Sequence, residues 1–568
     1  MAKKEVDEVI LKWALDNARK HEGKASPGAV IGKLLSELPE LKPKLKEISP
    51  KVQETVAEVN SLNIDLQIEK LKEIAPELLE EKKIVEEKKL KDLKDAREGG
   101  VVLRMAPSPS GPLHIGHAFV LSINSEYARK YKGKLILRID DTNPENIYPP
   151  AYEMIEKDAQ WLTQGNISEV VCQSDRLKSY YDYAEKLVLK GKAYVCTCDP
   201  ERVRKWISQK EACPCRELSK EEQQRRWDKM FLEYKPGDAV LRIKTDLEHP
   251  NPAMRDWTAF RINEHKHPKQ GTEFRVWPLM NFAVACDDHD LGVTHTIRGK
   301  DHMDNARKQA QICEFFGWKP PIDLYFGMIN FIGAKLSTTE LRKAIEYGEY
   351  DDWDDIRLQT IRALKRRGYQ PEAFVRFAID IGLGMSDKKV SIDEFFKMLN
   401  AHNRDLIEPK ADRYFFVWDP VAKEIKDAPE KIVKISKHPD YLERGMRELE
   451  FNGHVLMTKD DEKEIQNNNL CRLMDCINFV RENGEYIFDS EEYEKYREEG
   501  TRILHWLPNN DKNIPVEVLM PDKTIKKGVA EEGIKNLKIG DIIQFERFGF
   551  CRLDAKEDEV YKFWFAHR

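Results

Sequence analysis

Residues 104–117 read RMAPSPSGPLHIGH, and this stretch decides the fold of the chain around it. An apolar run, VVLRM (101–105), leads into it, and a helix pattern, HAFVLSINSEYARKY (117–131), follows. The next run, KLILRIDDT (134–142), is strand-like again. Strand, loop, helix and strand form a βαβ unit, which builds parallel sheets whose ligands bind at the carboxyl ends of the strands. The sequence therefore predicts a nucleotide-binding α/β fold.

The loop itself carries groups that suit a phosphate. Because it lies between a strand and a helix, it directs backbone N–H groups and a helix N-terminus toward one point. His114 and His117 are one helical turn apart and would face the same ligand, while Gly116 leaves room for a nucleotide base. Such donors suit in-line displacement at an α-phosphate, which requires stabilisation of negative charge rather than a nucleophile. Taken alone, the two histidines could equally pack or bind a metal ion.

The remaining strands of the sheet are expected far along the chain. Strand-like runs recur in GVTHTIRG (292–299) and LYFGMINFIG (324–333), with a helix pattern, NARKQAQICEFFGW, between them and a polar loop, AKLSTTELR, after them. An insertion over 175–275, which includes the basic helix pattern SKEEQQRRWDKM, therefore splits the sheet domain into 99–174 and 276–340.

The two ends of the chain have different patterns. Residues 1–98 are expected to be a helical appendage, from LKWALDNARK and VIGKLLSEL to a long charged run that ends at Gly99-Gly100. Helix patterns return over 341–410, which we expect to be a helical connecting domain. Over 411–568, short alternating runs such as IPVEVLM and GDIIQFERFGFCRLD predict β-barrels. The predicted fold class is multidomain, α/β plus all-β.

Length and composition agree with this division. At roughly 100 to 200 residues per domain, 568 residues fit several domains, and 41% hydrophobic residues can fill their cores. The start, MAKKEVDEVI, has no apolar signal segment, and no long apolar run occurs, which predicts a cytoplasmic protein without a membrane span. The net charge of 94 − 100 = −6 indicates no global attraction to nucleic acid, although local basic stretches could bind it.

Four of the ten cysteines form two close pairs. In a reducing compartment, cysteines are expected to be free thiols or metal ligands. Cys196-x-Cys198 and Cys213-x-Cys215 can supply a tetrahedral zinc ion that would brace the inserted domain, and four reduced, partly buried thiols are the alternative. The other six have no such spacing and are expected in cores: Cys172, Cys286, Cys313, Cys471, Cys476 and Cys551.

The stretch 104–117 resembles the signature of the class I aminoacyl-tRNA synthetases, in their glutamyl/glutaminyl subgroup. LRIDDTNP (137–144) is similar to the second strand of that subgroup, THTIRGKD (294–301) to the strand that carries amino-acid specificity, and KLSTT (335–339) to the Lys-Met-Ser-Lys-Ser loop. The C-terminal pattern resembles the paired anticodon-binding barrels of glutaminyl and of archaeal or eukaryotic glutamyl members, so the chain looks archaeal-type. The resemblance implies a Rossmann-type sheet with an inserted domain that binds the acceptor end of tRNA.

The resemblance also implies roles for individual residues. Arg104 would bind a substrate carboxylate, Ser108 would orient it, and Asp140 would pair with the α-ammonium. Arg298 stands where glutamate-accepting members have an Arg that binds the γ-carboxylate. The implied catalytic residues are His114, His117, Lys335 and Ser337, and the implied ATP-binding residues are Pro107, Gly111, His114, Gly116, His117, Asp301 and Lys335.

Structural roles remain open for three of these residues. Asp140 could cap its own turn, Arg298 could form an ion pair with Asp301, and Lys335 could belong to a mobile surface loop.

The chain departs from the family pattern in two places. Relatives often have a Tyr beside the substrate side chain, where this chain has Leu279, Met280 and Asn281, so that pocket cannot be copied from them. Thr338 stands where the second Lys of the signature loop belongs. Lys335, aided by Arg342 or Lys343, would then have to neutralise the departing pyrophosphate.

The implied reaction joins L-glutamate to tRNA(Glu) in two steps, through glutamyl-adenylate, with ATP and Mg²⁺. The resemblance leaves open whether tRNA(Gln) is charged as well, and residues 1–98 could dock tRNA or a protein partner. Three alternatives stay open at this point: a glutaminyl-tRNA synthetase, a nucleotidyl-transferring enzyme that does not use tRNA, and a non-catalytic tRNA-binding relative.

Overall fold

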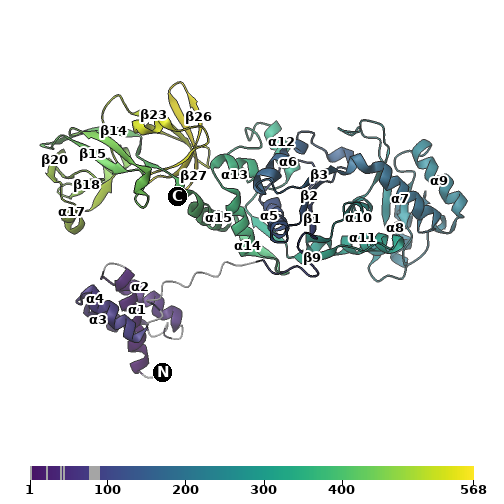
Figure 1. Cartoon of the computed structure of the whole chain (residues 1–568), viewed down its shortest axis with the longest axis horizontal. Coiled ribbons are helices and arrows are strands. Elements are labelled where there is room, and N and C mark those ends of the chain that lie inside the picture. Colours follow the sequence, from purple (N-terminus) through teal and green to yellow (C-terminus); the bar gives the residue numbers. More distant parts are fainter. Residues whose placement is uncertain (1–2, 21–22, 39–40, 42–44, 76–77, 79–89) are drawn as a thin grey trace. The chain divides into compact units, whose positions relative to one another are not determined.

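The computed structural model describes residues 3–20, 23–38, 41, 45–75, 78 and 90–568, and the chain divides into two units, 1–89 and 90–568 (Figure 1). The described part of the first unit contains four helices: α1 (Lys3–Lys20), α2 (Pro27–Glu37), α3 (Leu45–Asn60) and α4 (Ile64–Ile74). Ile10, Ala14 and Ala18 recur at helical spacing on α1 and are fully buried in the core that the four helices share. The helices predicted in LKWALDNARK and VIGKLLSEL are confirmed.

The charged run before Gly99 does not continue as the helix that its pattern predicts. α4 ends at Ile74, and 76–77 and 79–89 lie outside the described residues. Residues 90–98 are irregular, so the helix prediction is wrong there. Leu93 is buried in the core of the second unit and donates its N–H to Tyr131 Oη at 2.9 Å. These tertiary contacts outweigh local helix propensity.

The sheet of the second unit is parallel, as predicted, and pairs in the order β1–β2–β3: β1 (Val102–Met105), β2 (Lys134–Ile139) and β3 (Glu169–Cys172). The connecting helices are α5 (Ile115–Lys130) and α6 (Ala151–Leu162). On the other side of β1, two further strands pair in parallel, β8 (His295–Gly299) and β9 (Ile322–Phe326). Thr294 N–H donates to Val102 O at 3.0 Å, so strands from both sides of the insertion lie side by side.

The run LYFGMINFIG was predicted as one strand and forms two. After β9, the strand β10 (Ile329–Ile332) pairs instead with β11 (Lys388–Ser391). Gly327 separates them, and its N–H donates to Gly384 O at 2.8 Å. A Cβ at this position would collide with the backbone of Ser386, so the close approach of the two chain segments requires glycine.

The inserted segment has its own antiparallel sheet, in the order β4–β5–β6–β7: β4 (Ala193–Cys196), β5 (Val240–Ile243), β6 (Thr258–Ile262) and β7 (Val276–Pro278). Its helices are α7 (Leu177–Leu189), α8 (Pro200–Gln209) and α9 (Lys220–Leu232). Trp227, Phe260 and Trp277 are buried in its core. The chain then returns to the parallel sheet through α10 (Met280–Asp290), and α11 (Met303–Phe316) follows β8.

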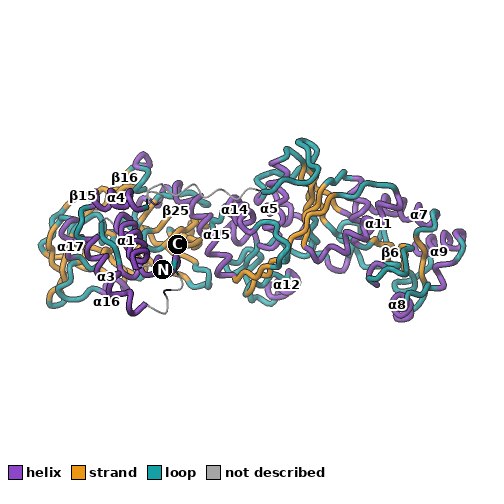
Figure 2. The backbone as a smooth tube through the Cα atoms, turned by 90° about the horizontal axis from the view of Figure 1, so that it is seen from below, coloured by secondary structure: helices purple, strands orange, loops and turns teal. Residues whose placement is uncertain are grey.

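Helices connect this part of the unit to the C-terminal strands (Figures 1 and 2). They are α12 (Thr338–Glu346), α13 (Ile361–Arg367), α14 (Pro371–Ile381) and α15 (Ile392–Ile407). From α13, Arg366 Nη2 donates to Asp554 Oδ2 at 2.6 Å and Arg367 Nη2 donates to Ala566 O at 2.9 Å. The C-terminal region is thus fixed to the connecting helices by charged and backbone contacts.

The chain after residue 411 is barrel-like, as the alternating runs predict. Its elements are β12 (Arg413–Tyr414), β13 (Phe416–Trp418), β14 (Pro420–Lys426), β15 (Lys431–Ser436), β16 (Met446–Phe451), β17 (His454–Thr458), α16 (Lys459–Glu464), β18 (Cys471–Leu473), β19 (Asn478–Glu482), β20 (Glu485–Ser490), α17 (Tyr493–Glu499), β21 (Arg502–Leu504), β22 (Leu507–Pro508), β23 (Ile514–Leu519), β24 (Ile525–Ala530), β25 (Ile542–Phe545), β26 (Gly549–Glu557) and β27 (Val560–His567). One sheet has the order β12–β25–β26–β27–β23–β24–β13 and the other β21–β18–β19–β20–β14–β17–β22. Because only Phe415 separates β12 from β13, the two ends of the first sheet meet and it closes on itself.

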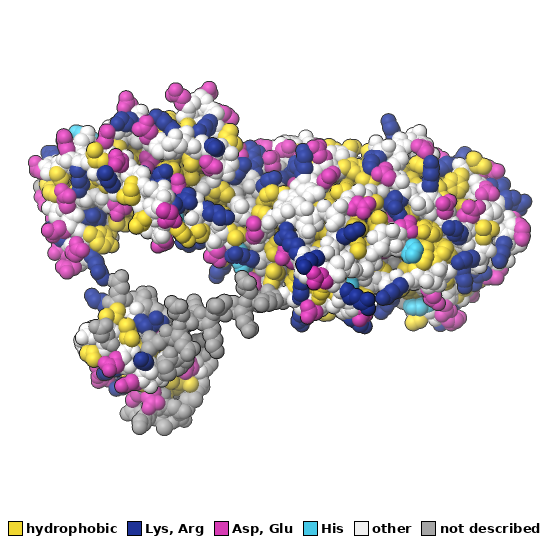
Figure 3. All heavy atoms as spheres, in the orientation of Figure 1, with side chains coloured by type: hydrophobic (Ala, Val, Ile, Leu, Met, Phe, Trp, Pro, Cys, Tyr) yellow, Lys and Arg dark blue, Asp and Glu magenta, His cyan; other side chains and the backbone are white. Residues whose placement is uncertain are grey.

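The surface carries charges of both signs. On the face shown in Figure 3, Lys and Arg side chains alternate with Asp and Glu side chains over the second unit, in keeping with the net charge of −6. No helix among the described residues has the length and apolarity to cross a bilayer.

Candidate active site

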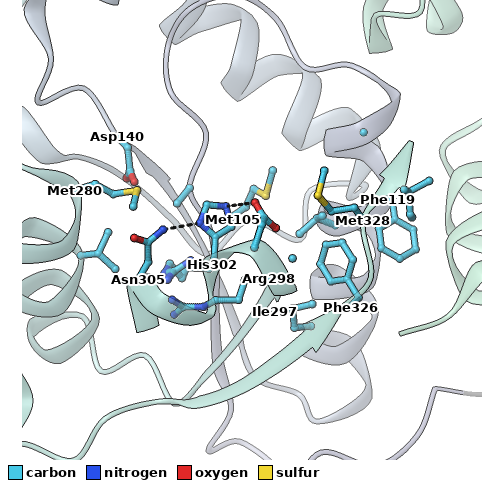
Figure 4. A pocket seen from close by; sticks show the side chains of 18 of the residues that line it. Met105, Phe119, Asp140, Met280, Ile297, Arg298, His302, Asn305, Phe326 and Met328 are labelled. Carbon is cyan, nitrogen blue, oxygen red and sulfur yellow. Dashed lines mark hydrogen bonds and ion pairs between the residues drawn. The ribbon is translucent and has the colours of Figure 1, made fainter. Parts of the chain in front are cut away.

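A cavity of about 340 Å³ opens at the carboxyl ends of the parallel strands. Figure 4 shows Asp140, Met280 and Asn305 on one side of it and Phe119 and Met328 on the other. Five residues predicted from the sequence line it: Arg104, Gly116, Asp140, Arg298 and Asp301. The cavity therefore has a charged half and an apolar half, which suits a ligand that combines a charged group with a planar base.

A buried cluster of charges forms the base of the polar half. Arg104 donates from Nε and Nη2 to the two carboxylate oxygens of Asp288, at 2.8 and 3.2 Å. Arg138 donates from Nη1 to the same Asp288 at 3.1 Å, and from Nε and Nη2 to Asp140 at 2.7 and 3.2 Å. Asp140 is therefore held by Arg138, which lies two residues before it on β2.

The pKa values of the acids in this cluster follow from their neighbours. Burial raises the pKa of Asp288, but the Arg104 and Arg138 guanidinium groups outweigh it and hold that pKa below its usual value. Burial raises the pKa of Asp140. Sequence reasoning missed both Arg138 and Asp288, although an Arg inside the apolar run KLILRI and the acid pair in CDDHD were visible signals.

Arg298 is 9% exposed and has three partners inside the protein. It donates from Nε to Thr296 Oγ1 at 3.0 Å and from Nη1 to Gln309 Oε1 at 2.8 Å, and its Nη2 lies 3.0 Å from Asp323 Oδ1. The predicted alternative partner, Asp301, is replaced by Asp323, because Asp323 of β9 lies across the strand pair from Thr296 of β8. Burial and the charge of Arg104 lower the pKa of Arg298.

His114 and His117 share the N-terminal end of α5. His114 Nδ1 accepts from Gly116 N–H at 3.1 Å, His117 Nδ1 accepts from His114 N–H at 3.3 Å, and the ring centroids are 3.9 Å apart. Burial lowers the pKa of His114 to about 2 and that of His117 to about 4, so both rings are neutral near pH 7. Since each Nδ1 is an acceptor, each neutral ring carries its proton on Nε2. The pair thus offers two neutral N–H donors beside a helix N-terminus.

The loop between β1 and α5 contacts the loop before α12. Ser110 Oγ and Thr338 Oγ1 are 2.8 Å apart, and a Cβ on the buried Gly111 would lie 3.0 Å from Thr338 Cβ. Thr338, the departure from the family pattern, therefore packs between the two loops. Pro107 is buried in the first loop, whereas Ser108 is exposed.

Lys335 and Ser337 lie outside the cavity lining. Lys335 is exposed, with Nζ 3.2 Å from Glu349 Oε1 and 5.7 Å from the centroid of the Tyr350 ring. Ser337 caps α12 by accepting from Glu340 N–H at 3.4 Å. The structure therefore brings the Arg and Asp residues together at the cavity and places Lys335 on a separate surface contact.

The structure shows the positions of Met280 and Asn281, which belong to the segment where relatives often have a Tyr beside the substrate side chain. Met280 lines the cavity, while Asn281 lies behind it and donates from Nδ2 to Asn305 Oδ1 at 3.1 Å. Gln309, which sequence reasoning also missed, lines the cavity beside Arg298. Its position in a helix pattern gave no signal of a role in a site.

The four paired cysteines lie close together in the inserted segment and are not part of the cavity lining. The sulfur atoms of Cys196, Cys198, Cys213 and Cys215 all lie within 4.8 Å of one another. Cys198 Sγ is 3.3 Å from Cys213 Sγ and 3.6 Å from Cys215 Sγ. Tetrahedral zinc with Zn–S bonds of about 2.3 Å separates its sulfur ligands by about 3.8 Å. The cluster could therefore hold a zinc ion.

The other six cysteines were expected in cores. Cys286, Cys313, Cys471, Cys476 and Cys551 are buried, and Cys172 is half-buried.

Comparison with known proteins identifies the family. Residues 100–408 match the model of "tRNA synthetases class I (E and Q), catalytic domain", and residues 411–495 and 503–554 match two models of "tRNA synthetases class I (E and Q), anti-codon binding domain". The chain belongs to the class I tRNA synthetases of the E and Q group.

Its relatives include proteins named glutamate–tRNA ligase. The chain is 48% identical to that of Thermococcus kodakarensis over 580 residues, 48% to that of Pyrococcus abyssi over 579 residues, and 44% to that of Methanothermobacter thermautotrophicus over 566 residues. Each match covers 99% of this chain and 100% of the relative.

The lowered pKa of His117 predicts a dependence of stability on pH. The unfolded chain takes up a proton at this residue below about pH 6.5, whereas the folded chain does so only near its own pKa of about 4. Stability from this group is therefore present above pH 6.5 and lost as the pH falls toward 4. Between pH 7 and pH 5, wild type should lose up to about 2 kcal/mol more than His117→Asn. Unfolding midpoints at the two pH values measure this, and equal losses in both proteins would contradict it.

Proposed function

We propose that this chain is a glutamate–tRNA ligase, which joins L-glutamate to tRNA(Glu) through glutamyl-adenylate at the expense of ATP. The observation that carries the choice of glutamate is the Arg298 guanidinium in the wall of the cavity. Three of its N–H groups have protein partners, and an Arg has five, so two remain for a γ-carboxylate. The relatives named above support the same activity.

The charged half of the cavity would hold the amino acid. Asp140 offers a carboxylate to the α-ammonium, and Arg104 turns its remaining N–H donors toward a substrate carboxylate. Ser108, exposed at the loop above, would help to orient the substrate. Because Asp288 fixes Arg104 and Arg138, and Arg138 in turn fixes Asp140, little reorganisation is needed when the substrate binds.

The apolar half would hold the base of ATP, and the helix end would hold its phosphates. Gly116 and Phe119 line the cavity next to the first turn of α5. The Nε2–H groups of His114 and His117 would stabilise negative charge on the α-phosphate as the glutamate carboxylate displaces pyrophosphate. Pro107 and Gly111 shape the loop over this point, and Asp301, which also lines the cavity, would accept from ribose hydroxyls.

Mg²⁺ would enter with ATP. Within the described chain, the four cysteines are the only group of three or more His, Cys, Asp or Glu side chains close enough to share a metal ion. The cavity therefore provides no carboxylate cage, which agrees with the preference of Mg²⁺ for phosphate oxygens and water with few protein ligands.

The tRNA would span the second unit. The inserted segment would bind the acceptor end, so that a ribose hydroxyl of the terminal adenosine takes the glutamyl group, and the barrels would bind splayed anticodon bases. The proposal includes tRNA(Gln) as a second substrate and a role for residues 1–98 in docking tRNA or a protein partner. A protein that charges tRNA for translation would work in the cytoplasm.

The cysteine cluster would hold one structural zinc ion. The sulfur spacing fits tetrahedral coordination, and Arg226 donates from Nη1 to Cys215 Sγ at 3.2 Å, which favours a thiolate there. We expect about one zinc per chain, and loss of the metal in Cys213→Ser/Cys215→Ser. Elemental analysis of protein purified without chelator measures both, with Cys172→Ser as the control. Metal-free wild type would show that the four thiols are simply reduced cysteines.

Lys335 would leave Glu349 and neutralise the pyrophosphate during activation, together with Ser337 of the same loop. Its contacts are exposed and therefore weak, so the movement costs little. Lys335→Ala should lower kcat of pyrophosphate exchange by about 100-fold with little change in the KM for glutamate. Lys343→Ala, on α12, tests the competing candidate and should have the smaller effect. A larger loss in Lys343→Ala than in Lys335→Ala would transfer the role to Lys343.

Arg298→Ala tests the assignment to glutamate. A desolvated γ-carboxylate without its cation is strongly penalised. The loss of transition-state stabilisation, calculated from kcat/KM for glutamate, should therefore be about 2 to 5 kcal/mol, and the preference for glutamate over glutamine should become smaller. The measurement is ATP–pyrophosphate exchange with each amino acid in the presence of tRNA(Glu).

The matched control is Arg307→Ala, an Arg of α11 that pairs with Asp304 at the surface and lies outside the cavity lining. If wild type exchanges equally well with glutamine, the chain would be a glutaminyl-tRNA synthetase. A chain that binds tRNA without any exchange would be the non-catalytic relative.

A further inference from the structure

A row of polar side chains runs from Arg298 along the wall of the cavity. Arg298 Nη1 lies 2.8 Å from Gln309 Oε1, and Gln309 Nε2 lies 3.2 Å from Asn281 Oδ1. Asn281 Nδ2 lies 3.1 Å from Asn305 Oδ1, and Asn305 Nδ2 lies 3.0 Å from His302 Nδ1. We call these five residues the amide relay. Figure 4 shows its outer end, where Asn305 and His302 face the cavity together with Arg298.

The direction of the relay is fixed by the cation at its inner end. A guanidinium group has only donors, so the atom of Gln309 that faces Arg298 must be oxygen. Gln309 therefore presents N–H to Asn281, which must accept with its own oxygen. Asn281 then donates its N–H to the oxygen of Asn305. Asn305 in turn donates its N–H to His302 Nδ1, which must be the acceptor. Flipping any one of these side-chain amides, so that its oxygen and nitrogen exchange places, would bring two donors or two acceptors into contact.

The relay determines what the wall offers to a substrate. Each amide oxygen faces a donor within the relay, while each amide nitrogen uses one N–H there and keeps a second. Gln309 and Asn305 line the cavity, and each has a second N–H that is available to a ligand there. Asn281 is not part of the lining and is hydrogen-bonded to both of them. A wall of donors suits the oxygens of a carboxylate and opposes the N–H₂ of a carboxamide.

The charge of Arg298 alone does not fully explain why glutamate would be selected over glutamine. Asp323 Oδ1 lies 3.0 Å from Arg298 Nη2, and this carboxylate offsets much of the positive charge in its surroundings. Rejection of glutamine then depends on the orientation of neutral donors, because a site built to hydrogen-bond one group discriminates strongly against an analogue that leaves polar atoms unpaired.

We infer that the amide relay selects a γ-carboxylate over a γ-carboxamide, with Asn281 as a positioning residue that never touches the substrate. This inference rests on the proposed activity with glutamate. It assigns to Asn281, Gln309 and Asn305 a role that their side-chain types alone did not indicate.

Asn281→Leu provides the sharpest test, because it removes the middle of the relay while leaving Arg298 and the cavity lining in place. The ratio of kcat/KM for glutamate to that for glutamine should fall about tenfold or more, with the KM for ATP unchanged. Asn330→Leu is the matched control: this Asn is exposed on β10 and lies outside both the cavity lining and the relay, so its ratio should stay at the wild-type value. The assay is tRNA(Glu)-dependent ATP–pyrophosphate exchange.

Asn305→Ala, at the half-exposed outer end, serves as the second variant if Asn281→Leu does not fold. A wild-type ratio in whichever of the two variants is folded would overturn the role of the relay. A wild type that accepts both amino acids equally would instead overturn the proposed activity, so the two failures are distinguishable.

Discussion

The carboxylate of Asp288 lies between the guanidinium groups of Arg104 and Arg138, and the geometry of the cavity depends on this contact. The two Arg residues stand on neighbouring strands, β1 and β2, and both are buried. Arg104 pairs in register with Ile136 of β2, and Arg138 pairs with Val171 of β3. Two such cations would repel each other without an anion, and removing one partner of a buried ion pair is strongly destabilising. Asp288 lies on α10, which follows the inserted segment in the chain. The contact therefore requires the chain to come back to β1 after the insertion.

The same contact links the fold to the proposed chemistry. Arg138 is held by Asp288 on one side and holds Asp140 on the other, and Arg104 is aimed by the same carboxylate. The groups expected to grip the amino acid are therefore positioned before it binds, which is how an electrostatic site stabilises charge without reorganising. At the N-terminal end of α5, hydrogen bonds from backbone N–H groups fix the tautomers of His114 and His117 in a similar way.

Much of this could be predicted from contiguous sequence, and the rest depends on contacts between distant residues. The stretch 104–117 and the run 134–142 predict the βαβ unit because each element is encoded locally. By contrast, Arg104 and Asp288 are 184 positions apart, and Arg298 finds Asp323 rather than the nearby Asp301 because β8 and β9 pair in register. Local pattern also failed at residues 90–98 and at Gly327, where packing against the sheet and a close backbone approach decide the structure.

A crystal structure with a non-hydrolysable glutamyl-adenylate analogue tests most directly whether the prepositioned charges define the substrate site. The account predicts the γ-carboxylate within hydrogen-bond distance of Arg298, the α-ammonium against Asp140, and the adenine beside Met328, with Asp288 still bridging Arg104 and Arg138. A γ-carboxylate directed away from Arg298, while that residue stays paired with Asp323 and Gln309, would contradict it.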